Sequence, residues 1–119
     1  MEHELSAFYD VTHGVGLAVL TPNWMRYVLS EKTEARFARY GEAVWDLDRS
    51  LPRREKAETA IRKTREFFNS LGLPATLTEL GIDGAHFAEM ARKARTANFD
   101  RTFVPLSAED IQEIYKMSL

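Results

Sequence analysis

Apolar residues recur at intervals of three and four along almost the whole chain, and this spacing restricts it to helices. Runs that alternate apolar and polar residues and are rich in β-branched side chains, as half-buried strands require, are missing. The length of 119 residues and the apolar content of 45% suffice to bury one core. We therefore expect an all-α fold, a helical bundle in which residues 1–119 form a single domain.

Three apolar stripes predict helices in the first two thirds of the chain. The first stripe crosses Pro22, so we expect a kink there, or a restart in which Thr21 caps a second helix. The second stripe ends in the polar stretch around Pro52. The third keeps the helical period best, and Gly72 ends it. The residues expected to face inward are Leu17, Leu20, Trp24, Tyr27 and Val28, then Phe37, Tyr40, Gly41, Val44 and Trp45, then Ala57, Ala60, Ile61, Thr64, Phe67, Phe68 and Leu71.

Two helix-start signals follow in the last third of the chain. Residues 76–79 have the T-x-x-E form of a capping box, in which Thr76 and Glu79 open a short helix that Gly81 ends. Asp83 can cap a further helix over residues 84–97. The residues expected to face inward in this helix are Phe87, Met90, Ala91 and Ala94.

The final helix has the clearest start signal. Ser107 is expected at the N-cap with Asp110 at the third helical position, and Leu106 can pack on Ile111 as a hydrophobic staple. A loop over residues 97–105 is expected to precede this helix, which continues to the C-terminus.

The charge balance excludes two classes of partner. A formal charge of −2, from 18 acidic and 16 basic side chains, leaves no excess of positive potential for nucleic acid or an anionic membrane. No apolar run approaches the ~20 residues that cross a bilayer, and acidic residues stand at the N-terminus where a secretory signal has basic ones. The chain has no Cys, so it offers neither disulfides nor thiolate chemistry, and a reducing cytoplasm is its simplest location.

Two histidines near the N-terminus carry most of the functional information. If a helix ends near Tyr9 or Asp10, His13 can begin the next helix and point back toward His3. Neutral imidazole is a good ligand for a first-row divalent metal. A histidine at a helix start is more often a cap or a surface group, and two histidines alone make no metal site.

Two other interpretations of the same segment are weaker. Gly14 and Gly16 form a G-x-G step, but Val19 stands where a dinucleotide-binding motif needs its third glycine, and no strand precedes the turn, so tight helix packing is favoured. A stand-alone metal-binding bundle would require Glu2 and Glu4 to converge with the two histidines.

The string from Glu2 to Ala18, E-H-E-L-S-A-F-Y-D-x-x-H-G-x-G-L-A, resembles a metal-region signature of the iron-containing alcohol dehydrogenases. The likeness is greatest to their butanol dehydrogenase and aldehyde reductase branch, and it continues more weakly through residues 22–25, 67–74, 77–82 and 105–111. The resemblance implies the helical C-terminal part of a longer two-domain enzyme, with a fold like the C-terminal domain of dehydroquinate synthase-like proteins. The N-terminal nucleotide-binding domain is then absent from this chain.

The resemblance also implies roles for two residues. His13 matches the last histidine ligand of the family's catalytic divalent metal, which is iron or zinc. His3 matches a histidine that lies near the nicotinamide and the substrate and helps to move protons. Phe8 and Tyr9 are expected to be core or pocket wall, and Asp10 a helix-end cap or a hydrogen-bonding partner.

The expected parent enzyme interconverts a small alcohol and an aldehyde with NAD(P)H and the metal. In the family one Asp and three His hold the metal, and only the match of His13 lies in this chain, because another ligand histidine would precede His3 by four residues. His86 matches nothing in the pattern. We therefore expect the isolated chain to be inactive, with at most weak metal binding.

A non-enzymatic helical module is the alternative hypothesis. A domain that normally packs on a nucleotide-binding domain leaves an apolar patch uncovered, and such patches favour association. We therefore expect the chain to form homo-oligomers through exposed apolar surface.

Overall fold

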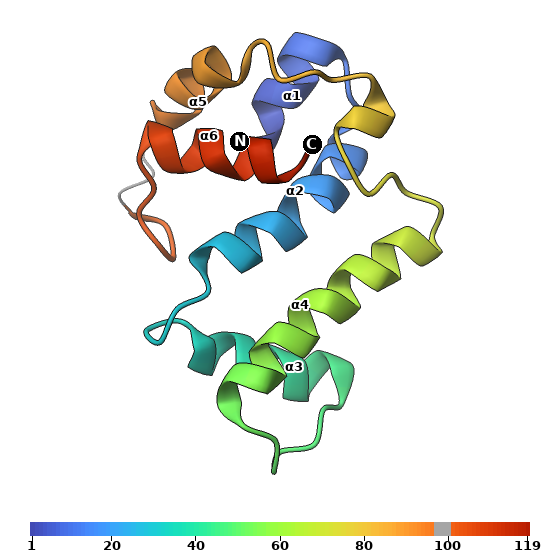
Figure 1. The fold of residues 1–119 in the computed structure, drawn as a ribbon, viewed down its shortest axis with the longest axis vertical. Helices are drawn as coiled ribbons and strands as arrows, with labels where there is room; N and C mark the ends of the chain where they lie inside the picture. The colour runs from blue at the N-terminus through green and yellow to red at the C-terminus, as the bar shows by residue number, and fades with distance from the viewer. Residues whose placement is uncertain (97–100) are drawn as a thin grey trace.

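The computed structural model describes residues 1–96 and 101–119, and every regular element in this part is a helix (Figure 1). The predicted all-α class is confirmed. Among the described residues, no helix is long and apolar enough to cross a lipid bilayer. The elements are α1 (Glu2–Tyr9), α2 (His13–Val28), α3 (Glu34–Trp45), α4 (Arg53–Ser70), the short 3-10 helix η1 (Thr78–Leu80), α5 (Phe87–Arg95) and α6 (Ala108–Met117).

Helix α2 is the central element of a flat molecule that measures 44 × 33 × 17 Å. Its first half lies beside α1, and α6 and α4 pack along it (Figure 1). Helices α3 and α4 form a hairpin at one end, whereas α5 packs on α6 and α1 at the other. The N-terminus of α2 therefore lies within the α1, α5 and α6 group.

The core is one continuous cluster of buried apolar side chains drawn from all six α-helices and from the loops between them, and Leu80 of η1 packs against it partly buried. Each such side chain contributes about 1.5–3 kcal/mol when it is fully removed from water. Tyr115 of α6 is completely buried, and its hydroxyl donates to the carbonyl oxygen of Met1 at 2.7 Å. Burial, with the acidic Glu4 and Glu2 nearby, raises the pKa of Tyr115. This contact fixes the start of α1 against α6.

Of the two outcomes expected at Pro22, a kink or a restart, the restart is wrong, because α2 is one helix from His13 to Val28 with Pro22 inside it. A proline inside a helix removes one backbone hydrogen bond and crowds the preceding turn. Here Pro22 is fully buried, and packing of α2 against α4 and α6 offsets that cost.

Asn23, the next residue, anchors this part of α2. Its buried amide group donates to the Val19 carbonyl at 3.1 Å and to the Ser118 hydroxyl at 3.0 Å. The guanidinium group of Arg65 in α4 donates to the Asn23 side-chain oxygen. One buried side chain thus joins α2, α4 and the C-terminus, and all its polar atoms are paired, as burial requires.

Four residues predicted to face the core are exposed instead. Leu17 is 42% exposed, Val44 57%, Phe67 48% and Leu71 60%. Val44, Phe67 and Leu71 belong to the hairpin of α3 and α4, whose main helix contacts among the described residues are with each other and with α2, so part of its apolar surface stays exposed.

The starts of the later helices differ from the expected ones. The T-x-x-E segment forms a 3-10 helix over Thr78–Leu80 rather than an α-helix, and Gly81 ends it in the left-handed conformation as predicted. Asp83 accepts a hydrogen bond from the Ala85 backbone at 3.0 Å, which makes a turn, and α5 begins three residues beyond the expected start. Residues 97–100 lie outside the described residues. They include the expected helix end at residue 97 and the first part of the expected loop over 97–105.

The final helix matches its prediction. The Ser107 hydroxyl accepts from the Asp110 backbone, and the Asp110 carboxylate accepts from the Ser107 backbone, so the capping box is complete. Leu106 and Ile111 are both buried in the core. The hydroxyl of Tyr27 in α2 also donates to Asp110 at 2.6 Å, which ties the start of α6 to α2.

We predict that the hydrogen bond between Tyr27 and Asp110 stabilises the protein at neutral pH but not in acid. This bond, then the backbone bond from Ser107, lowers the pKa of Asp110, and the same bond raises the pKa of Tyr27 to about 12. A depressed carboxyl pKa contributes stability above the ordinary value of 3.8, and that stability is lost as the pH falls through the depressed value. The raised pKa of Tyr27 contributes stability below its ordinary value of 10.0, and that stability is lost as the pH rises through about 12.

Tyr27→Phe should therefore lower the free energy of unfolding by about 1 kcal/mol at neutral pH, and the loss should shrink toward about pH 2. Urea unfolding at a series of pH values measures this. Tyr40→Phe is the matched control, because Tyr40 bonds the neutral hydroxyl of Thr64 at 2.8 Å and its loss should not depend on acid pH. A deficit for Tyr27→Phe that stays constant down to about pH 2 would contradict the role of Asp110.

Candidate functional site

The turn between α1 and α2 brings the N-terminal segment together. Helix α1 ends because Asp10 takes the left-handed conformation, with φ 53° and ψ 36°, and its backbone N–H donates to the Ser6 carbonyl at 3.1 Å. Asp10 is thus a helix-end residue, as expected. Three residues later α2 begins at His13, with Thr12 at the N-cap. The chain reverses in this short turn, so the first residue of α2 returns to the first residues of α1.

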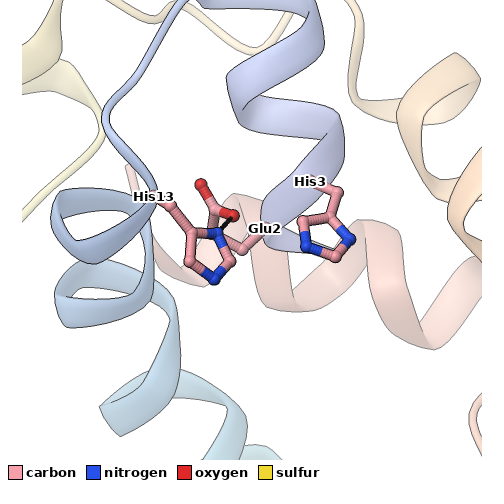
Figure 2. Close-up of side chains that lie close together, drawn as sticks. All are labelled: Glu2, His3 and His13. Carbon is pink, nitrogen blue, oxygen red and sulfur yellow. Dashed lines mark hydrogen bonds and ion pairs between the residues drawn. The ribbon is translucent and has the colours of Figure 1, made fainter.

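His3 and His13 face each other across this turn (Figure 2). Their rings stack with centroids 5.1 Å apart and an angle of 23° between the planes. The geometric expectation that His13 begins a helix and points back toward His3 is therefore confirmed. The side chain of His13 is 55% exposed, so a ligand can reach it from solvent.

Glu2 is the third member of the site. Its side chain is only 4% exposed, and one carboxylate oxygen bonds Nδ1 of His13 (Figure 2). The other oxygen lies 2.8 Å from the hydroxyl of Ser6, whose single proton can go to it or to the Val11 carbonyl, also at 2.8 Å. Sequence reasoning considered Glu2 only for the stand-alone metal site, because nothing in a helical pattern shows that an acidic residue at a helix start is buried.

Glycine at position 16 makes room for this carboxylate. A Cβ atom there would lie 2.6 Å from one Glu2 oxygen and 2.8 Å from its Cγ, closer than atoms approach without bonding. Gly14 has open space where its Cβ would be. The expectation of tight packing at the G-x-G step therefore holds for Gly16, where the close neighbour is a side chain of α1.

In the described part of the chain, the group whose ligand atoms could hold a metal consists of Glu2, His3 and His13. These atoms lie within 4.8 Å of one another. Glu4 does not belong to the group, so the convergence that the stand-alone metal site required is incomplete. The imidazoles are suitable donors for a first-row divalent metal, and Nε2 of His13 is left unpaired by the contact of Nδ1 with Glu2. These three residues thus suit a metal ion whose coordination is completed by further ligands.

An apolar cavity of about 290 Å³ adjoins the buried carboxylate. Leu17, which follows His13 by one helical turn, lines it with Leu20 and Trp24, and Met1, Glu2 and Thr21 complete the wall. Leu17 was predicted for the core, but it lies at the surface of α2 beside the histidines. The cavity thus has a mostly apolar wall with the Glu2 carboxylate at its edge.

The other end of α1 has a different environment. Phe8 and Tyr9 are partly buried against the core, as expected. The ring of His86 lies 5.5 Å from that of Phe8 and 6.0 Å from that of Tyr9, and Lys93 Nζ lies 4.5 Å from the Phe8 ring centre. His86 is exposed and does not belong to the group of Glu2, His3 and His13, which we call the histidine group.

The chain is similar in sequence to known proteins over its whole length. The sequence model described as "Fe-containing alcohol dehydrogenase family, C-terminal" matches residues 1–119. NADH-dependent butanol dehydrogenase A of Clostridium acetobutylicum is 49% identical over 120 residues, which cover 99% of this chain and 31% of that protein. NADPH-dependent aldehyde reductase of Escherichia coli is 32% identical over 91 residues, which cover 76% of this chain and 23% of that protein. This chain thus spans about a third of the length of the curated relatives that it matches over its whole length.

Solved structures agree with the sequence matches. A crystal structure of 1,3-propanediol oxidoreductase superposes with a TM-score of 0.87 at 28% identity, and the match covers 99% of this chain and 31% of that one. Butanol dehydrogenase A from Thermotoga maritima superposes with a TM-score of 0.81 at 28% identity over 98% of this chain and 31% of that one. The helical fold is therefore that of one part of a larger protein in each relative.

We predict that Gly16→Ala disrupts the contact between α1 and α2. The new methyl group must displace the Glu2 side chain, and overpacking of this kind costs about 1–3 kcal/mol. Gly14→Ala is the matched control on the same helix, since both variants gain the helix propensity of alanine and only one meets a neighbour. Urea unfolding should show Gly16→Ala to be less stable than Gly14→Ala by about 1–3 kcal/mol. Equal stabilities would show that the carboxylate is not held against Gly16.

Proposed function

This chain belongs to the iron-containing alcohol dehydrogenase family, and on that premise we propose that it forms the metal and substrate side of a two-domain, NAD(P)-dependent alcohol dehydrogenase. The reaction is the interconversion of an alcohol and an aldehyde by hydride transfer. The observation that carries the proposal is the pair of histidines at the α1–α2 turn, one at each helix start, with their rings stacked and a buried carboxylate on one of them. The chain is about a third of its curated relatives, so the activity belongs to the longer protein.

His13 is the proposed metal ligand in this chain. It is exposed at the first position of α2, and only its Nδ1 is engaged by Glu2, so Nε2 is available. When bound, a divalent metal acts as a Lewis acid on the substrate oxygen, and the nicotinamide gives or takes the hydride. The remaining ligands come from outside this chain.

His3 is the proposed proton-handling group near the nicotinamide and the substrate. It is exposed and stacks on His13, so a proton on its ring lies beside the proposed substrate oxygen without being committed to a buried partner. Imidazole is suited to this work because it gains and loses a proton near neutral pH. The apolar cavity lined by Leu17, Leu20 and Trp24 provides a wall for the alkyl part of a small alcohol.

The isolated 119-residue chain should have no dehydrogenase activity. It supplies one of the metal ligands and no nucleotide-binding domain, so neither cofactor is held in a reactive position. Oxidation of NADH or NADPH with butanal, followed with and without added Fe²⁺ or Zn²⁺, tests this. A longer protein that contains the chain together with a nucleotide-binding domain is the positive control, and its His13→Ala variant should lose nearly all activity. Turnover by the pure isolated chain would contradict the proposal.

A packing role is favoured by a separate observation. Val44, Phe67 and Leu71 are exposed on the α3 and α4 hairpin, and Phe67 is in edge contact with Trp45 at 6.0 Å; we call the three exposed side chains the apolar patch. Exposed apolar patches of this kind are commonly covered by another protein surface. We propose that this patch is covered by a second domain in the longer protein and by a second copy when the chain is alone.

Light scattering on the purified chain should therefore give a mass above that of a monomer. Phe67→Lys should shift the chain toward the monomer, because a charge in the apolar patch must be desolvated on association. Glu66→Ala is the control, since Glu66 is exposed next to the patch and forms an ion pair with Arg62 on the same helix. A monomeric wild-type chain at high concentration would contradict self-association.

A further inference from the structure

We propose that Glu2 is a positioning residue, whose buried carboxylate holds the His13 ring with its proton on Nδ1 and so presents Nε2 to a metal. The inference rests on the proposed function, because that function gives His13 a metal to bind. It goes further, because it assigns a role to Glu2, which the proposed function does not use.

The burial of Glu2 is the first argument. A carboxylate with 4% of its side chain exposed loses most of its hydration, and this loss is tolerated only where hydrogen-bond donors replace water. The donors beside it are the hydroxyl of Ser6 and Nδ1 of His13. An ionised carboxylate only accepts hydrogen bonds, so Nδ1 must carry the proton. A neutral ring protonated at Nδ1 has its lone pair on Nε2.

The rigidity of the carboxylate is the second argument. Glu2 is the first residue of α1, and its side chain fills the space over Gly16 where any larger residue would collide. It contacts Ser6 on its own helix and His13 on the next, so it is fixed from two sides. Figure 2 shows Nδ1 of His13 directed at this carboxylate and the opposite edge of the ring directed away from it. The contact therefore fixes the orientation of the ring as well as its proton.

Direct ligation of a metal by Glu2 is less consistent with these contacts. A metal on the Glu2 oxygen nearest His13 would have to replace the Nδ1 proton, and the same oxygen would lose the bond that compensates its burial. Ligand histidines in proteins usually donate their second ring nitrogen to a carboxylate or carbonyl oxygen, and loss of such a partner typically costs 10–100-fold in metal affinity. Glu2 and His13 have this arrangement before any metal is added.

The experiment is ¹⁵N NMR of the histidine rings in the full 119-residue chain, with His13 identified from the His13→Ala variant. At a pH where the ring holds one proton, His13 should be protonated at Nδ1. Added Zn²⁺ should shift Nε2 and leave the Nδ1 proton in place. A neutral His13 protonated at Nε2, or zinc that displaces the Nδ1 proton, would overturn the inference from the wild-type protein alone.

Variants separate positioning from charge. Glu2→Ala should lose the preference for the Nδ1 proton, whereas Glu2→Gln should keep much of it, because the amide oxygen still accepts a hydrogen bond. Glu4→Ala removes the same charge from the same helix and should leave the His13 ring unchanged, since Glu4 is outside the histidine group. An effect of Glu4→Ala as large as that of Glu2→Ala would overturn the inference, because it would reduce the role of Glu2 to its charge. Circular dichroism confirms that each variant is folded.

Zinc affinity distinguishes failure of this inference from failure of the proposed function. Glu2→Ala should weaken binding by about 10–100-fold and His13→Ala should abolish it. If His13→Ala leaves the affinity unchanged, His13 is not the ligand and the proposed function fails. If His13→Ala abolishes binding but Glu2→Ala does not weaken it, the proposed function stands and the positioning role of Glu2 is refuted.

Discussion

The Glu2 carboxylate lies between α1 and α2 with almost no access to water, and the arrangement of the N-terminal segment follows from how that charge is compensated. Two donors must reach it, so Ser6 has to lie one turn along α1 and His13 has to lie at the start of α2. The approach of the two helices also requires a residue without a side chain, which is Gly16. The same contacts that allow the charge to be buried thus bring the two histidines together.

Helix α2 connects this site to the rest of the molecule. Its first residue is in the histidine group, its middle holds the buried amide of Asn23 that joins α4 and the C-terminus, and Tyr27 near its end bonds the capping box of α6. A helix anchored at three points along its length is a rigid support, and ligand residues on rigid elements keep their geometry better than those on loops. The proline inside α2 is accommodated because both sides of the helix are packed.

The family relationship explains why the molecule is flat and partly open. The matched relatives are about three times as long as this chain, and in each solved structure the helical fold is one part of a larger protein. His3 and His13 are exposed, and the hairpin of α3 and α4 leaves Phe67 and Leu71 at the surface. A surface of this kind is expected of a domain that packs against another part of a longer protein.

The sequence by itself determined the helical class, most helix positions and the capping box of α6, because these depend on residue spacing and on contacts within a few residues. It also determined, through one seventeen-residue string, the family to which the chain belongs. Only the tertiary structure decided that α2 continues through Pro22, that Leu17 and Leu71 lie outside the core, and that Glu2 is buried on His13. The reason is physical: helical periodicity shows which side chains share a face, but the burial of that face depends on which helices pack against it, and those neighbours are distant in the chain.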